Sequence, residues 1–72
     1  MTVTFKTYMK TYLEVDDRFG DLARDITRDE SFPRTTKYDR IMDHLIKSGA
    51  CVEARETFHD AYWKYLQERE DE

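Results

Sequence analysis

The sequence predicts an all-α fold, a compact domain of four helices that spans residues 1–72. Apolar residues recur at helical spacing in four successive segments, and only 2 Gly and 1 Pro interrupt them. A core of this size rarely contributes more than about 3–5 kcal/mol, and the single Cys excludes an internal disulfide. We therefore expect the aromatic residues, which make up 14% of the chain, to supply most of the stability.

The first helix is predicted over about residues 4–14, with Thr4 as its N-cap. Its apolar stripe follows the spacing i, i+3, i+4, i+7 and i+8 and consists of Phe5, Tyr8, Met9, Tyr12 and Leu13. Lys6 and Lys10 lie off this stripe, so we expect both ammonium groups to face solvent.

The second helix is predicted over about residues 18–29, with Asp16 or Asp17 as its N-cap. Its stripe consists of Phe19, Leu22, Ala23 and Ile26. Gly20 falls in the first turn, where a weak helix former is tolerable because the helix end is near. The helix ends before Phe32, because the residue that precedes a proline avoids the α region.

The third helix is predicted over about residues 37–48. Thr35 or Thr36 supplies the N-cap, and Thr36 followed by Asp39 resembles a capping box with the shorter acid. The stripe consists of Tyr38, Ile41, Met42, Leu45 and Ile46. Gly49 is the expected left-handed residue at the C-terminal end.

The fourth helix is predicted over about residues 52–68. Its stripe consists of Ala54, Phe58, Ala61, Tyr62, Tyr65 and Leu66. Residues 68–72 place negative charge at the negative end of the helix dipole, so we expect this acidic tail to fray.

The chain resembles the YozE family of small bacterial proteins, which have a fold similar to the sterile alpha motif (SAM-like). The resemblance is strongest at Leu22, Ala23, Asp25, Ile26, Asp29, Phe32 and Pro33. The chain departs from the family at Lys6, where an aromatic residue is usual, and at Tyr62, where Trp is usual and Trp63 follows instead. The resemblance implies a four-helix cytoplasmic protein of a Gram-positive bacterium, and it implies no activity.

The composition and charge of the chain disfavour several classes of protein. Charged residues make up 39% of the chain and the mean hydropathy is −0.92, yet the regular apolar spacing favours a folded domain over disorder. The formal net charge of −4 disfavours general attraction to nucleic acid or anionic lipid. The first residues lack the pattern of a signal peptide, and no apolar run reaches membrane-spanning length. With the lone Cys, these observations favour a cytoplasmic protein, a monomer or weak homodimer.

No residue cluster predicts an enzyme, a cofactor or a metal. His44, His59 and Cys51 do not fall at metal-ligand spacing, so we expect surface or boundary histidines. Cys51 opens the last helix, where backbone donors activate a thiol in some proteins. No basic residue adjoins it in the sequence, so a small structural residue that fills the helix junction is the favoured interpretation.

Two surfaces are candidates for binding. The first is basic: Lys37, Arg40, His44 and Lys47 share one arc of the third helix, opposite its apolar stripe, and Arg34 precedes them. Such a row suits phosphates, although Asp39 and Asp43 share the helix and a solvated face is the favoured interpretation.

The second candidate is apolar. Trp63 lies off the stripe of the fourth helix, near Val52 and His59 on the helical wheel. It is either an exposed contact residue, as Trp often is at interfaces, or it is covered by the first helix or the N-terminal segment. The leading hypothesis is a non-enzymatic module that binds a protein, another or itself, through Val52, His59 and Trp63. The alternative is a nucleic-acid-binding module that uses Arg34, Lys37, Arg40 and Lys47.

Overall fold

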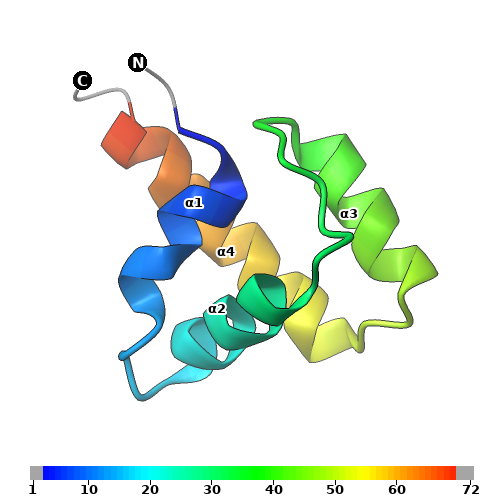
Figure 1. Ribbon diagram of the computed structural model, residues 1–72, viewed down its shortest axis with the longest axis horizontal. Coiled ribbons are helices and arrows are strands. Elements are labelled where there is room, and N and C mark those ends of the chain that lie inside the picture. The colour runs from blue at the N-terminus through cyan, green and yellow to red at the C-terminus, as the bar shows by residue number, and fades with distance from the viewer. Residues whose placement is uncertain (1–2, 70–72) are drawn as a thin grey trace.

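The computed structural model describes residues 3–69, and every regular element among them is a helix. The elements are α1 (Phe5–Met9), the 3-10 turn η1 (Lys10–Tyr12), α2 (Arg18–Arg28), α3 (Tyr38–Lys47) and α4 (Val52–Arg69) (Figure 1). The predicted all-α fold is therefore confirmed. The helix predicted over residues 4–14 is shorter than expected, since its last turn tightens into η1 and ends at Tyr12.

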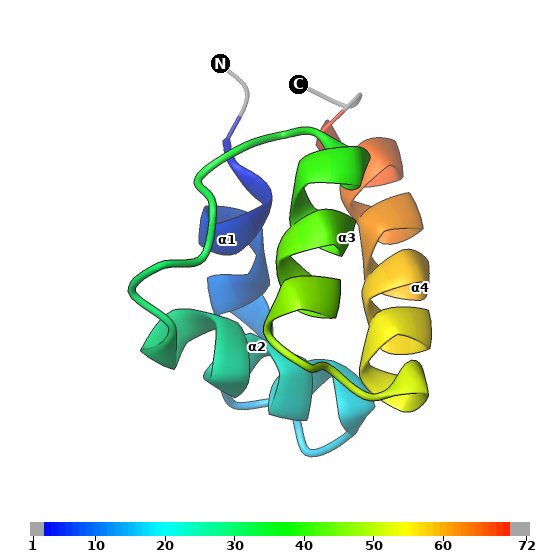
Figure 2. The ribbon, with the colours of Figure 1, turned by 90° about the vertical axis from the view of Figure 1, so that its right-hand side faces the viewer.

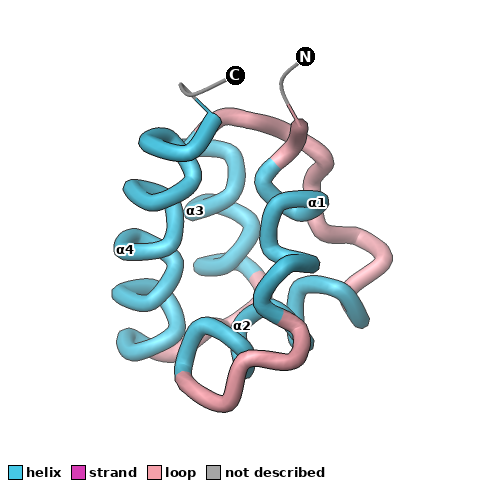
Figure 3. The backbone as a smooth tube through the Cα atoms, turned by 90° about the vertical axis from the view of Figure 1, so that its left-hand side faces the viewer, coloured by secondary structure: helices cyan, strands magenta, loops and turns pink. Residues whose placement is uncertain are grey.

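The longest helix, α4, packs against each of the other three. α3 stands beside α4, and α2 crosses beneath them (Figure 2). On the side that faces away from α3, α1 and η1 stand opposite α4, above the first turns of α2 (Figure 3). The loop between α2 and α3 then climbs past α1 to the start of α3.

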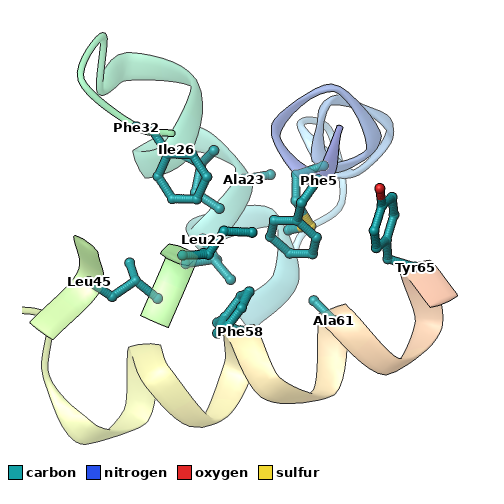
Figure 4. Close-up of a cluster of buried hydrophobic side chains, with 11 residues drawn as sticks. Phe5, Leu22, Ala23, Ile26, Phe32, Leu45, Phe58, Ala61 and Tyr65 are labelled. Atoms are coloured by element: carbon teal, nitrogen blue, oxygen red, sulfur yellow. The ribbon is translucent and has the colours of Figure 1, made fainter. Parts of the chain in front are cut away.

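The core lies where these helices meet (Figure 4). Its buried side chains are Phe5, Met9, Leu22, Ala23, Ile26, Phe32, Ile41, Leu45, Phe58, Ala61 and Tyr65. The ring of Phe5 meets Phe58 and Tyr65 edge to face, with centroids 5.2 and 5.6 Å apart. Such pairs add about 0.5–1.5 kcal/mol each to the burial of their area.

The entry to α2 explains Gly20. The Asp17 side chain caps the helix by accepting hydrogen bonds from the backbone N–H of Phe19 and Gly20. The chain leaving η1 then passes so close that a Cβ on Gly20 would lie 1.7 Å from the carbonyl oxygen of Val15. Gly20 is thus required by a close backbone approach, and the sequence indicated only a tolerated weak helix former.

The exit from α2 is organised by Asp29. Its carboxylate accepts hydrogen bonds from the backbone N–H and hydroxyl of Ser31, at 3.0 and 2.7 Å, and lies 2.7 Å from Nε2 of His44. The bond to His44, followed by that to the Ser31 side chain, lowers the pKa of Asp29 to about 2. Phe32 is buried as predicted, with its ring 5.4 Å from that of His44.

Two sequence expectations fail at this exit. Lys6 is 9% exposed, and its ammonium donates to the carbonyl oxygen of Asp29 at 2.9 Å. His44 faces Asp29 and Phe32 and does not point outward with Lys37, Arg40 and Lys47. In both cases the end of α2 covers a helix face that looked free when each helix was considered alone.

The ends of α3 also differ in part from expectation. Thr36 does not cap the helix, and the hydroxyl of Thr35 accepts from the N–H of Lys37 at 3.2 Å. Gly49 has a φ of +80°, as predicted for the left-handed residue after a helix.

The start of the acidic tail is held in place. α4 includes Glu68, whose carboxylate accepts a hydrogen bond from the Tyr8 hydroxyl. Burial and this bond raise the pKa of Tyr8 above its ordinary value, so the phenol remains a donor. The fraying expected for residues 68–72 stays a prediction, and residues 70–72 lie outside the described residues.

Candidate interaction surface

Residues of α3 and α4, the two helices that stand side by side in Figure 2, form an aromatic surface. Its members line a cavity of about 280 Å³ and are Tyr38, His59, Tyr62, Trp63 and Leu66. Trp63 is 56% exposed, so neither α1 nor the described part of the N-terminal segment covers it. A large exposed apolar side chain beside a hollow is typical of recognition surfaces.

His59 fixes the orientation of Trp63. The indole Nε1–H of Trp63 donates to His59 Nε2 at 3.1 Å, and the Tyr38 hydroxyl lies 3.1 Å from Nδ1 of the same ring. Because an indole N–H only donates, Nε2 must be the acceptor, and neutral His59 carries its proton on Nδ1. The Tyr38 oxygen then accepts a hydrogen bond from the Nδ1–H group, and three side chains form one hydrogen-bonded row.

Tyr62 joins this surface to the core. Its hydroxyl donates to the carbonyl oxygen of Thr36 at 2.6 Å, and its ring meets that of Tyr38 edge to face at 5.2 Å. Both rings also pack on Phe58, which is fully buried. The floor of the aromatic surface is therefore part of the packed interior, and its geometry is fixed before any partner arrives.

The structure brings together two of the three contact residues expected from the sequence. His59 and Trp63 form one hydrogen-bonded pair, whereas Val52 is 58% exposed near the start of α4 and does not line the cavity. Tyr38 and Tyr62 were predicted as core residues, and both are partly buried against the core and also line the cavity. Helical spacing identifies the side of a helix that is buried and does not reveal which of its side chains remain partly exposed.

Two of the four predicted nucleic-acid contacts lie next to the aromatic surface. Lys37 and Arg40 line a second cavity of about 530 Å³ together with Thr36, Tyr38, Asp39 and Tyr62. Among residues 3–69, no carboxylate oxygen lies within 4.0 Å of the charged nitrogens of Lys37 or Arg40.

The other two predicted nucleic-acid contacts are separated from this pair. Lys47 is engaged by Asp43, with 3.0 Å between Nζ and Oδ2. Arg34 lines a different cavity, with Lys6 and Lys10. With His44 turned inward, the continuous basic row expected on the third helix does not form.

His44 and Cys51 are the chemistry-bearing residues that remain. Ser48 and Asp29 both approach Nε2 of His44, at 3.4 and 2.7 Å, whereas a Ser–His–Asp relay uses opposite ring nitrogens. Between residues 3 and 69, no three His, Cys, Asp or Glu side chains gather as a metal site. Cys51 is exposed at the edge of a cavity of about 310 Å³, so it does not fill the helix junction as expected.

The family model for the YozE SAM-like fold matches residues 4–67. The chain belongs to this family. The resemblance identified in the sequence is thus confirmed, and the match includes the whole aromatic surface of this YozE SAM-like protein. No curated protein and no solved structure matches the chain. No helix within the described range combines the length and apolar character needed to cross a membrane.

Proposed function

We propose that this YozE SAM-like domain is a non-enzymatic protein-interaction module whose aromatic surface receives an apolar side chain of a partner protein. The observation that carries the proposal is the state of Trp63, which is 56% exposed and yet held by His59 beside a preformed hollow. A fixed aromatic side chain loses little conformational entropy on binding. Trp is also among the residues that contribute most to protein interfaces.

The neighbouring charges favour a particular partner chemistry. Lys37 and Arg40 lack ion-pair partners in the described chain and share their cavity with Tyr38 and Tyr62 of the aromatic surface. Asp39 lines the same cavity, which leaves an excess of positive charge. The partner that fits is an amphipathic segment of another protein, with an apolar side chain for the hollow and adjacent carboxylates for Lys37 and Arg40.

The cytoplasm of a Gram-positive bacterium is the proposed setting. The chain has 1 Cys, which is exposed as a free thiol, and such a residue suits a reducing compartment.

Peptide display tests the proposal. A library of short random peptides is selected on the immobilised domain and the recovered peptides are measured on Trp63→Ser and on Val52→Ser, a control at a similarly exposed apolar residue outside the cavity. We expect recovered peptides that combine Leu, Phe or Trp with Asp or Glu, that bind Val52→Ser normally and that lose Trp63→Ser. Equal binding to Trp63→Ser and the unmodified domain would refute the surface assignment. Self-association lost in Trp63→Ser would replace the foreign partner by a second copy.

A nucleic-acid-binding function is the second candidate, because the structure places aromatic rings beside Lys37 and Arg40. Rings beside basic residues are typical of surfaces that stack single-stranded bases. This function predicts binding of single-stranded DNA or RNA that weakens steeply with salt. The charge reversals Lys37→Glu and Arg40→Glu should then abolish binding. Absence of amide shifts with single-stranded or duplex probes at low salt would exclude this candidate.

A further inference from the structure

A separate cavity of about 220 Å³ lies between the first turns of the chain and the loop after Pro33. We refer to it as the basic cavity, and its lining residues are Thr4, Lys6, Thr7, Lys10 and Arg34. It shares no residue with the aromatic surface. Three of its five lining side chains are cationic and none is acidic, although the chain as a whole has a net charge of −4.

Lys6 is the unusual member, because a lysine side chain is rarely buried without a carboxylate partner. Lys6 is 9% exposed, and its acceptor among the described residues is a neutral group, the carbonyl oxygen of Asp29. The carboxylate of Asp29 is engaged elsewhere, by Ser31 and His44. That carbonyl occupies one of the three donors of the ammonium group.

Lys10 and Arg34 add two further charges that the protein does not neutralise. In the described chain no carboxylate oxygen lies within 4.0 Å of the charged nitrogens of Lys6, Lys10 or Arg34. Like charges gathered around one hollow repel one another. A bound anion would offset this repulsion.

The hydroxyl groups of the basic cavity also supply a donor. Thr4 Oγ1 donates to Thr7 Oγ1 at 3.1 Å and accepts from the backbone N–H of Thr7. The hydroxyl proton of Thr7 therefore remains available to a ligand oxygen. The volume of about 220 Å³ far exceeds the ~10–15 Å³ that one water requires, so a tetrahedral oxyanion has room.

We propose that the basic cavity binds a phosphate-type oxyanion. The Arg34 guanidinium can grip two phosphate oxygens, and the two ammonium groups contribute charge and further donors. The Thr7 hydroxyl completes the donor set. This site is independent of the proposed protein-binding function. Its residues lie outside the aromatic surface and outside the second cavity, which Lys37 and Arg40 line.

An amide NMR titration with inorganic phosphate, compared with chloride at matched ionic strength, tests the site. We expect saturable shifts for phosphate alone at the five lining residues. Lys10→Gln and Arg34→Gln alter exposed side chains and should leave the fold intact, yet each should weaken phosphate binding at least about fivefold. Lys47→Gln is the control, because this exposed lysine lies outside the cavity. Unchanged affinity in both variants would overturn the proposal.

Two further probes distinguish the sources of the phosphate group, namely phosphoserine blocked at both ends and adenosine monophosphate. Saturation by any of the three probes at the lining residues supports the site, and the tightest probe identifies the carrier. Failure of all three overturns it. Trp63→Ser should bind phosphate like the unmodified domain, so the outcome here is independent of the outcome for the aromatic surface.

Discussion

Replacing Gly20 by alanine is a change for which helix preference and packing predict opposite signs. Gly20 is a buried residue in the first turn of α2. Alanine is more favourable than glycine in a helix interior by about 0.8–1.0 kcal/mol, so preference alone predicts a more stable protein. Packing predicts the reverse, because the new Cβ would lie 1.7 Å from the carbonyl oxygen of Val15 and 2.8 Å from its carbonyl carbon.

The size of the effect follows from what must move. Both obstructing atoms belong to the backbone, which must retreat by roughly 2 Å to restore an ordinary contact. That displacement strains two hydrogen bonds, from Val15 N–H to Tyr12 at 3.0 Å and from Arg24 to the carbonyl oxygen of Leu13 at 2.9 Å. Each bond contributes about 1 kcal/mol, and overpacking costs about 1–3 kcal/mol. After the helix gain is subtracted, we expect a net loss of about 2–4 kcal/mol.

Thermal and urea unfolding, followed by far-UV circular dichroism, measure this loss. For a domain of this length, about 1 kcal/mol corresponds to about 4–8 °C in Tm, so Gly20→Ala should lower Tm by roughly 10–30 °C. Asp25→Ala is the matched control, since this exposed position on α2 reports helix preference without the close approach. A Gly20→Ala protein as stable as the unmodified one would refute the packing argument.

Three further predictions address the other elements. Asp29→Asn should lower the free energy of unfolding at neutral pH by about 1–2 kcal/mol. This value is at the low end of the range for hydrogen bonds to charged groups, because the Asp29 side chain is 33% exposed. Because the pKa of Asp29 in the folded protein lies below its ordinary value, the stabilisation by its carboxylate is present above pH 3.8 and is lost as the pH falls through about 2. The free energy of unfolding, measured with urea across this pH range, should therefore fall less steeply with acid in Asp29→Asn than in the unmodified protein. Equal slopes of the unfolding free energy against pH would contradict this prediction. Gly49→Ala should lower the free energy of unfolding by about 1–2 kcal/mol through the left-handed backbone alone, because no atom lies within 4 Å of the new Cβ. Gly49→Asn should lower it less in the same unfolding assay. Equal losses in the two variants would argue against backbone strain. The fluorescence of Trp63, the one Trp of the chain, should resemble that of indole in water and shift little on unfolding; a strongly blue-shifted native emission would be inconsistent with its exposure.

Helical periodicity and end signals were sufficient for most of the fold. The cap at Asp17, the break at Phe32 and the left-handed Gly49 all follow from residue types whose local preferences act within one or two turns. The 3-10 ending of the first helix did not follow, because it is tied to the passage of Val15 over Gly20, a contact between elements.

Periodicity was less informative about the candidate sites, since it assigns one inner face to each helix. Lys6 and His44 lie off the stripes of their own helices, and only the end of α2 reveals that both are covered. Tyr38 and Tyr62 lie on their stripes, and only the pairing of α3 with α4 reveals that both remain partly exposed. The basic cavity was missed for the same reason, because Lys6 and Lys10 come from α1 and η1, whereas Arg34 comes from a loop.

The most direct test of the aromatic surface is the indole N–H signal of Trp63 in an NMR titration with an acidic, apolar peptide recovered by display. The chain has 1 Trp, so the signal is unambiguous, and its proton is the one donated to His59. Our account predicts a saturable shift of this signal together with the amides of Tyr38, Tyr62 and Leu66. A peptide that binds while the indole signal stays in place would contradict it.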